Sequence, residues 1–167
     1  MIIIVMGVTG SGKTTIGKML AEGLGWGFYE GDEFHPAGNV SKMKKGIPLN
    51  DNDRMPWLNT IRKLIMKCIK EKENAIITCS ALKDSYRNLL ASDNKEIKLV
   101  YLKGDYNVIQ KRLKNKNRKN HFMNPNLLKS QFDALEEPKN ALEIDISKKP
   151  KIIVESIKSE LTLLLCA

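Results

Sequence analysis

The segment from Gly7 to Thr14 reads G-V-T-G-S-G-K-T and has the residue types and spacing of a phosphate-binding loop. Its glycines allow the backbone to wrap closely around phosphate oxygens, and Lys13 can reach the β- and γ-phosphates of a nucleoside triphosphate. The Thr14 hydroxyl is the expected ligand for Mg²⁺. The backbone N–H groups of the rest of the loop and of the start of the following helix are expected to bind the phosphates. These residues are Val8, Thr9, Gly10, Ser11, Gly12 and Thr15.

Such a loop works only between a strand and a helix, and both are indicated here. The apolar run 1–6 precedes it, and Ile16, Met19, Leu20 and Leu24 follow at helical spacing. Further apolar runs alternate with helical patterns to the end of the chain, which predicts one domain, 1–167, with a parallel α/β sheet. The expected strands are Ile2–Met6, Trp26–Glu30, Ala75–Cys79, Ile97–Leu102 and, as a possible edge, Leu142–Ile146. The final helix is expected to follow Ser147, a candidate cap, with Pro150 near its first turn.

Polar residues that follow these strands should gather at one edge of the sheet. Asp32 and His35 follow the second expected strand, and Ser80 and Lys83 follow the third. The stretch from His35 to Pro56 is rich in Pro, Gly and Asn, and only a short helical pattern is visible near 40–43. Long insertions of this kind usually serve function, so a substrate-binding insert is expected at about 33–56.

The net charge of +9 indicates a basic protein, which could bind nucleic acid or anionic small molecules. The lysines are widely spread, and the one dense cluster, at 111–119, has no interleaved aromatic residues for base stacking. We therefore expect no nucleic-acid partner. No apolar run is long enough to span a membrane, and the first one is too short for a signal peptide. Three widely spaced cysteines show no metal-ligand pattern, and a reduced, cytoplasmic protein is expected.

Three groups of motifs resemble the gluconate kinases. Together with the phosphate loop, they cover residues 2 to about 138. In the insert they are His35-Pro36, Asn39, Lys42-Met43, Gly46, Pro48 to Asp51, Asp53-Arg54 and Pro56 to Leu58. After the third strand they are Cys79 to Lys83 and Tyr86-Arg87, and in the last group Arg112-Leu113, His121 to Met123, Leu127-Leu128, Gln131-Phe132, Leu135-Glu136 and Pro138.

The resemblance implies ATP-dependent phosphorylation of D-gluconate at its 6-hydroxyl, with ATP and Mg²⁺ as cofactors. It also implies the fold shared by shikimate and nucleoside-monophosphate kinases, a five-stranded parallel sheet of order 2-3-1-4-5 with helices on both faces and a mobile lid, here about 114–124. A homodimer is a further possibility that the resemblance raises. One departure from the family pattern is Glu30, which stands where aspartate is usual.

On the acceptor side, Asp32 is the candidate to take or orient the proton of the attacking hydroxyl, with a helix cap as the alternative. Arg54 can grip a sugar-acid carboxylate with two parallel hydrogen bonds, or it can pair with Asp51 or Asp53 as a purely structural bridge. The remaining candidates for substrate contact are His35, Ser80, Lys83, Arg87 and His121. For His35 a buried structural role is the alternative, and for Arg87 a surface role.

On the nucleotide side, Arg112 is expected to lie against the nucleotide, and Arg118 to close over the triphosphate with the lid.

Two other functions stay open. One is another hydroxyl kinase of this fold, such as shikimate kinase. The other is a regulatory or nucleic-acid-associated nucleotide-binding protein, which would need a recognition module that 167 residues do not accommodate.

Overall fold

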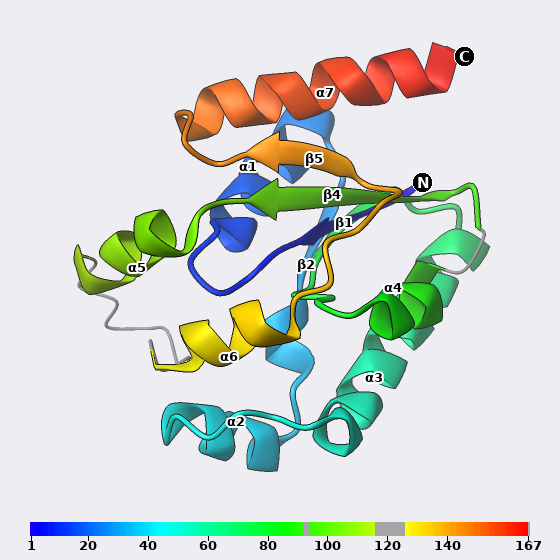
Figure 1. Ribbon diagram of the computed structural model, residues 1–167. Coiled ribbons are helices and arrows are strands. Elements are labelled where there is room, and N and C mark those ends of the chain that lie inside the picture. Colours follow the sequence, from blue (N-terminus) through cyan, green and yellow to red (C-terminus); the bar gives the residue numbers. More distant parts are fainter. Residues whose placement is uncertain (92–93, 116–125, 167) are drawn as a thin grey trace.

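The protein is built on a five-stranded parallel sheet of order β2-β3-β1-β4-β5 (Figure 1). The computed structural model describes residues 1–91, 94–115 and 126–166. In chain order the elements are β1 (Ile2–Met6), α1 (Lys13–Leu24), β2 (Gly27–Glu30), a 3₁₀ turn η1 (Gly31–Phe34), α2 (Ala37–Lys44), α3 (Asp51–Lys70), β3 (Ala75–Thr78), α4 (Asp84–Ala91), β4 (Ile97–Lys103), α5 (Tyr106–Asn115), α6 (Leu127–Ala134), β5 (Leu142–Asp145) and α7 (Pro150–Cys166). The predicted fold class and strand order are confirmed.

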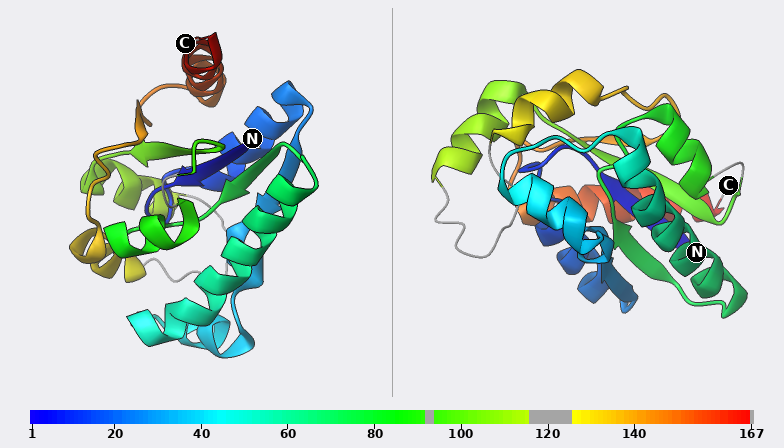
Figure 2. Two further views of the ribbon diagram at one scale, coloured as in Figure 1. Left: turned by 90° about the vertical axis from the view of Figure 1, so that its right-hand side faces the viewer. Right: turned by 90° about the horizontal axis from the view of Figure 1, so that it is seen from below.

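The central strand β1 is buried along its whole length because helices cover both faces of the sheet. Successive side chains of a strand point to opposite faces. Ile3 and Val5 therefore pack in the core that contains residues of α1 and α7, whereas Ile2, Ile4 and Met6 pack in the core that contains residues of α3 and α4. Figures 1 and 2 show these two layers on either side of the sheet.

Glycines mark both ends of α1. Gly12, directly before the helix, has φ 105°, and Gly25, directly after it, has φ 67°. Both values lie in the left-handed region, which favours glycine. No side chain caps the N-terminus of α1, so its first N–H groups remain available to an anionic ligand.

Most of the insert is helical, because α2 covers Ala37–Lys44 and α3 begins at Asp51, which corrects the expectation of only a short helical pattern near 40–43. Helix α3 begins at Asp51 because Asn50 and Asp53 form a capping box: the Asn50 side chain accepts from the Asp53 N–H, and the Asp53 carboxylate accepts from the Asn50 N–H. Pro56 lies inside the helix instead of ending a loop before it. The non-helical parts of this region are therefore short: His35 and Pro36 before α2, and Lys45 to Asn50 between α2 and α3.

The five predicted strands are all present, with ends that differ by at most one residue, and β5 is an edge strand as expected. Ser147 does not cap the final helix. Its N–H and its hydroxyl both bond to Asp145, and α7 begins at Pro150, whose fixed φ suits the first position of a helix. Among the helices within the described ranges, none is long and apolar enough to cross a membrane.

Candidate nucleotide and acceptor site

The phosphate loop joins β1 to α1 at the carboxyl edge of the sheet. At Gly7 (φ 142°) a Cβ atom would lie 2.9 Å from the carbonyl oxygen of Leu102, on the neighbouring strand β4, so only glycine fits. The Gly7 N–H points to the carbonyl oxygen of Ser80 at 3.4 Å, and this contact ties the loop to the end of β3. The loop is thereby fixed to both strands that flank β1.

The Lys13 side chain folds back over the loop that precedes it. Its Nζ donates to the carbonyl oxygens of Gly7 (3.0 Å) and Val8 (3.1 Å), and the side chain is buried. The ammonium group is thus held at the inner curve of the loop, which is where the sequence motif predicts it. Thr14 and Thr15 are exposed at the start of α1.

A cleft of about 170 Å³ lies beside the loop and is lined by Gly10, Gly12, Thr15, Arg112 and Lys148 among others. Arg112 reaches it from α5, and its Nη2 donates to the carbonyl oxygen of Ile146 at 2.6 Å. Arg112 therefore lies beside the phosphate loop, and its contact with the nucleotide stays a prediction. Arg118, His121 and nearly all of the predicted lid lie outside the described residues.

Glu30 ends β2, and its carboxylate turns inward to β3. One of its oxygens accepts a hydrogen bond from the Thr78 hydroxyl, and the same hydroxyl accepts from the Gly31 N–H at 3.1 Å. The Gly31 carbonyl oxygen in turn accepts from the Trp57 indole N–H at 2.7 Å. This chain of contacts fixes the η1 turn that carries Asp32, and Trp57 is a core residue that is 1% exposed.

His35 stacks on Trp57, with ring centroids 4.1 Å apart and planes inclined by 16°. Burial of the imidazole, reinforced by the charge of Arg54, lowers the pKa of His35 to about 4, so the ring is neutral at neutral pH. Its Nδ1 atom is buried and makes no hydrogen bond among the described residues. A neutral imidazole with a buried, unpaired nitrogen is suited to a polar ligand group.

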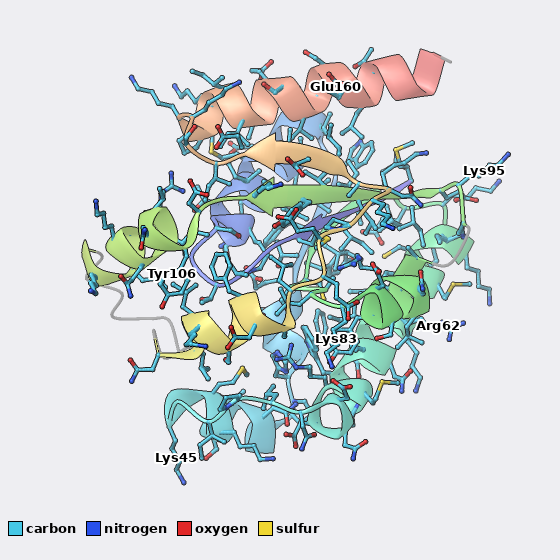
Figure 3. All side chains as sticks on the ribbon, in the orientation of Figure 1. Lys45, Arg62, Lys83, Lys95, Tyr106 and Glu160 are labelled. Carbon is cyan, nitrogen blue, oxygen red and sulfur yellow. The ribbon has the colours of Figure 1, made fainter. Side chains whose placement is uncertain are left out.

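A cavity of about 500 Å³ opens between α3, α4 and α6, and Figure 3 shows Lys83 in this region. Its lining residues are Pro48, Leu49, Asn50, Asp51, Asn52, Arg54, Lys83, Tyr86, Ser130 and Ala134. Two cationic groups flank the aromatic ring of Tyr86: the Arg54 guanidinium at 5.8 Å and the Lys83 ammonium at 5.6 Å from its centroid. The cavity therefore has a cationic wall of the kind that binds a small anion.

Asp51 is the acidic member of this wall. Lys83 donates to both of its carboxylate oxygens, at 2.7 and 2.9 Å, and the Tyr86 hydroxyl donates to one of them. Both contacts lower the pKa of Asp51. Asp53 pairs with Lys42 instead, at 2.7 Å. The described ion pairs of the two acids are thus made with lysines, and the suggested structural bridge from Arg54 to either acid is not observed.

Arg54 lies in the first turns of α3 and not in a loop. Its Nε donates to the Leu49 carbonyl oxygen at 3.3 Å, which directs the side chain along the cavity wall. The charge of Arg54 acts on the pKa values of both His35 and Tyr86, so these three side chains belong to one electrostatic neighbourhood.

Arg87 does not line this cavity. Its side chain is 4% exposed, and Nη1 donates to the carbonyl oxygens of Ala81 (2.9 Å) and Leu82 (3.0 Å). It lies beneath the connection between β3 and α4, which corrects the alternative of a surface role, and the expected carboxylate contact stays a prediction. Ser80 is half-buried at the end of β3 beside the phosphate loop.

The two halves of the site meet around Cys79, at the end of β3. Burial raises the pKa of this thiol to about 12, and the charges of Asp32, Lys13 and Arg54 all act on it. These residues come from η1, α1 and α3, so the candidate proton acceptor, the phosphate-loop lysine and the acceptor-side arginine all lie within electrostatic reach of one buried thiol. Sequence reasoning did not assign site roles to Tyr86 and Asp51, although Tyr86 lies one helical turn after Lys83.

A phosphate loop beside a cationic cavity at one edge of a parallel sheet defines a phosphate-loop kinase with a small acceptor. The family model described as Shikimate kinase matches residues 9–161. "Probable gluconokinase" of Dictyostelium discoideum is 45% identical over 170 residues, which cover 94% of this chain and 84% of that protein. "Thermosensitive gluconokinase" of Escherichia coli is 44% identical over 148 residues, covering 86% of this chain and 78% of its own.

Among solved structures, a gluconokinase from Sinorhizobium meliloti has a TM-score of 0.85 and 37% identity, and the match covers 97% of this chain and 91% of that one. These matches extend over 86–97% of this chain. The chain therefore belongs to the gluconokinase family.

Proposed function

We propose that the protein transfers the γ-phosphoryl group of ATP to the 6-hydroxyl of D-gluconate, forming 6-phospho-D-gluconate and ADP. The observation that carries this proposal is the cavity of about 500 Å³ with Arg54 and Lys83 on its wall. Its charge suits a sugar acid, and its volume lies within the range of small-molecule sites. The family relationship supports the same acceptor.

In this proposal the acceptor carboxylate binds at the Arg54 end of the cavity. The planar guanidinium offers two parallel N–H donors to a carboxylate. Lys83 and the neutral His35 ring bind sugar hydroxyls, and Ser80, beside the phosphate loop, contacts the sugar as well. His121 keeps its expected substrate contact as part of the proposal.

Phosphoryl transfer requires mainly positioning and charge neutralisation from the protein. Asp32 accepts or orients the proton of the 6-hydroxyl as that oxygen attacks the γ-phosphorus. Lys13 neutralises charge on the transferred group, and the amides from Gly10 to Thr15 hold the phosphates. The Arg112 cleft takes the nucleoside end of ATP, and Arg118 is proposed to contact the phosphates.

Mg²⁺ is the proposed metal, and the residues present fit a hard, oxygen-liganded ion. The Thr14 hydroxyl is exposed at the start of α1, and Glu30 has one buried carboxylate oxygen with no hydrogen-bond partner among the described residues. Thr14 would hold the ion. When bound, Mg²⁺ neutralises charge on the β- and γ-phosphates.

A coupled ADP-release assay with gluconate, shikimate, glycerate and AMP as acceptors tests the function. Turnover with gluconate is expected to exceed that with the other three by at least about a hundredfold, because only gluconate combines a carboxylate with a terminal hydroxyl on a six-carbon chain. Turnover confined to shikimate or AMP would overturn the acceptor assignment. ATP binding without turnover of any acceptor would favour a regulatory nucleotide-binding protein.

We also propose a cytoplasmic location, where ATP is available and where the buried thiols of Cys68 and Cys79 stay reduced. The homodimer that the resemblance implies stays a proposal as well. Light scattering of the purified protein, with and without ATP, tests it directly.

A further inference from the structure

We propose that Gln131 is a positioning residue that links the phosphate loop to the acceptor cavity through α6, so that nucleotide and acceptor binding are energetically coupled. The inference rests on the proposed function for the identity of the acceptor. The hydrogen bond between Thr9 and Gln131 does not depend on which acceptor binds, and it has no part in the roles described above.

The contact joins residues 122 positions apart in the chain. The Thr9 N–H, within the phosphate loop, donates to the Gln131 side-chain oxygen at 2.6 Å. Thr9 is 3% exposed and Gln131 is 6% exposed, so water does not replace this bond. A buried amide that loses its acceptor pays a desolvation penalty, and the loop would shift to recover a partner.

Thr9 is well placed to transmit such a shift to the catalytic lysine. It directly follows Val8, whose carbonyl oxygen, together with that of Gly7, accepts hydrogen bonds from the Lys13 ammonium. The Gln131 bond therefore restrains the same turn of backbone that holds Lys13.

Two other residues of α6 face the acceptor cavity. Ser130 and Ala134 line the 500 Å³ cavity, on either side of Gln131 in the sequence. Just beyond the helix, the Glu136 N–H donates to the Leu82 carbonyl oxygen at 2.9 Å. The Glu136 carboxylate accepts from the Asp84 N–H at 2.6 Å.

Leu82 and Asp84 flank Lys83, so the end of α6 is attached to the segment that presents this cavity lysine. The helix consequently makes hydrogen bonds or close contacts with both ligand sites. An acceptor that displaces α6 acts on Thr9 through Gln131, and phosphates that order the loop act on the cavity through the same bond.

The test compares Gln131→Leu, which removes the acceptor oxygen at similar size, with Gln131→Glu, which keeps an oxygen there. Lys129→Ala is the matched control, because Lys129 is exposed on the same helix and pairs only with Asp133 in the described contacts. Two quantities are measured: amide hydrogen exchange of Thr9 in the ligand-free protein, and affinity for a non-hydrolysable ATP analogue with and without gluconate.

In Gln131→Leu we expect amide hydrogen exchange of Thr9 to accelerate at least about tenfold. The factor by which gluconate increases the affinity for the ATP analogue should fall towards one. Gln131→Glu is expected to restore exchange protection, and Lys129→Ala to match the parent in both measurements. Unchanged Thr9 protection in Gln131→Leu, or undiminished coupling, would overturn the inference. Failure of the parent protein to turn over gluconate would refute the proposed function instead, and the Thr9 exchange comparison would still decide the role of Gln131.

Discussion

The guanidinium of Arg87 holds the backbone of Ala81 at the start of the connection from β3 to α4. Nη1 donates to the Ala81 carbonyl oxygen at 2.9 Å, and Ala81 has φ 44°, in the left-handed region. For a residue other than glycine this conformation costs on the order of 1 kcal/mol, so it persists only where surrounding contacts impose it. Arg87 supplies such a contact two residues before Lys83 enters the acceptor cavity.

Replacement of Arg87 by Met should therefore affect both stability and acceptor binding. We expect the free energy of unfolding to fall by roughly 2–4 kcal/mol, because buried carbonyl oxygens lose a charged donor. The KM for gluconate should rise more than the KM for ATP, because Lys83 is attached to the released segment. Urea denaturation and steady-state kinetics measure the two effects, and equal changes in both KM values would contradict the positioning role.

Replacement of Lys13 by Ala should lower turnover by several orders of magnitude, since it removes a charge directed at the transferred phosphoryl group. The fold should persist, because the side chain contacts loop carbonyls rather than the hydrophobic core. Turnover measured beside a thermal melt tests both statements. Lys18→Ala, at an exposed position on the same helix, is the control, and an active Lys13→Ala protein would refute the assignment.

Replacement of Arg54 by Lys should weaken gluconate binding far more than ATP binding. Lysine keeps the charge but loses the planar pair of donors, and a bidentate carboxylate contact would lose roughly 1–3 kcal/mol. Titration calorimetry with each ligand separates the two affinities. Arg62→Lys is a matched control because Arg62 is exposed on the same helix (Figure 3). An equal loss of ATP affinity would move Arg54 to the nucleotide side.

Replacement of Asp32 by Asn should nearly abolish phosphorylation while gluconate still binds. Asparagine keeps the shape and the hydrogen-bonding capacity but cannot accept the hydroxyl proton. Single-turnover kinetics and gluconate titration measure the two properties, with Glu33→Gln on the adjacent exposed residue as the control. A fall in the rate of phosphorylation of less than about tenfold would mean that the phosphate loop and the metal support the transfer without a base at this position.

The depressed pKa of His35 predicts a pH dependence of stability. In the unfolded chain the imidazole titrates near 6.5, and in the folded protein near 4, so the unfolded state binds more protons between these values. The free energy of unfolding should therefore fall as the pH drops from 6.5 to 4, by at most about 3 kcal/mol from this residue.

His35→Gln removes the titrating group, so the difference in stability between parent and variant measures its contribution. We expect this difference to change across pH 6.5–4 and to be constant above pH 7. Urea denaturation at a series of pH values provides the data. A constant difference throughout would mean that the ring is not held neutral by burial.

The arrangement of strands and the phosphate loop could be predicted from the sequence because the signals are local. A run of apolar residues, a glycine-rich loop and a helical pattern follow one another within 2–24, and each element forms beside the next. The start of α3 was missed although its signal was also local. Asn50 and Asp53 have the spacing of a capping box, but Pro56 suggested a loop, and tertiary packing of Trp57 and Leu58 overrides that preference.

The role of Arg87 could not be predicted in the same way. An arginine that follows a strand can face a ligand or turn beneath the loop. Only the backbone path of Ala81 and Leu82 determines which of these two orientations it takes. The contact between Gln131 and Thr9 depends on how α6 packs after a crossover of the chain. Contacts between residues that are distant in the sequence can be predicted only when the packing of the helices on the sheet is known.

Alternate side chains of β1 pack into two separate hydrophobic cores, one on each face of the sheet. Ile3 and Val5 support the layer of α1 and α7, whereas Ile4 and Met6 support α3 and α4. In evolutionary terms, substitutions under α3 and α4 fall in a different core from the one beneath the phosphate-loop helix α1. A lineage with this architecture can vary that wall of the acceptor cavity while it inherits the packing of α1 unchanged.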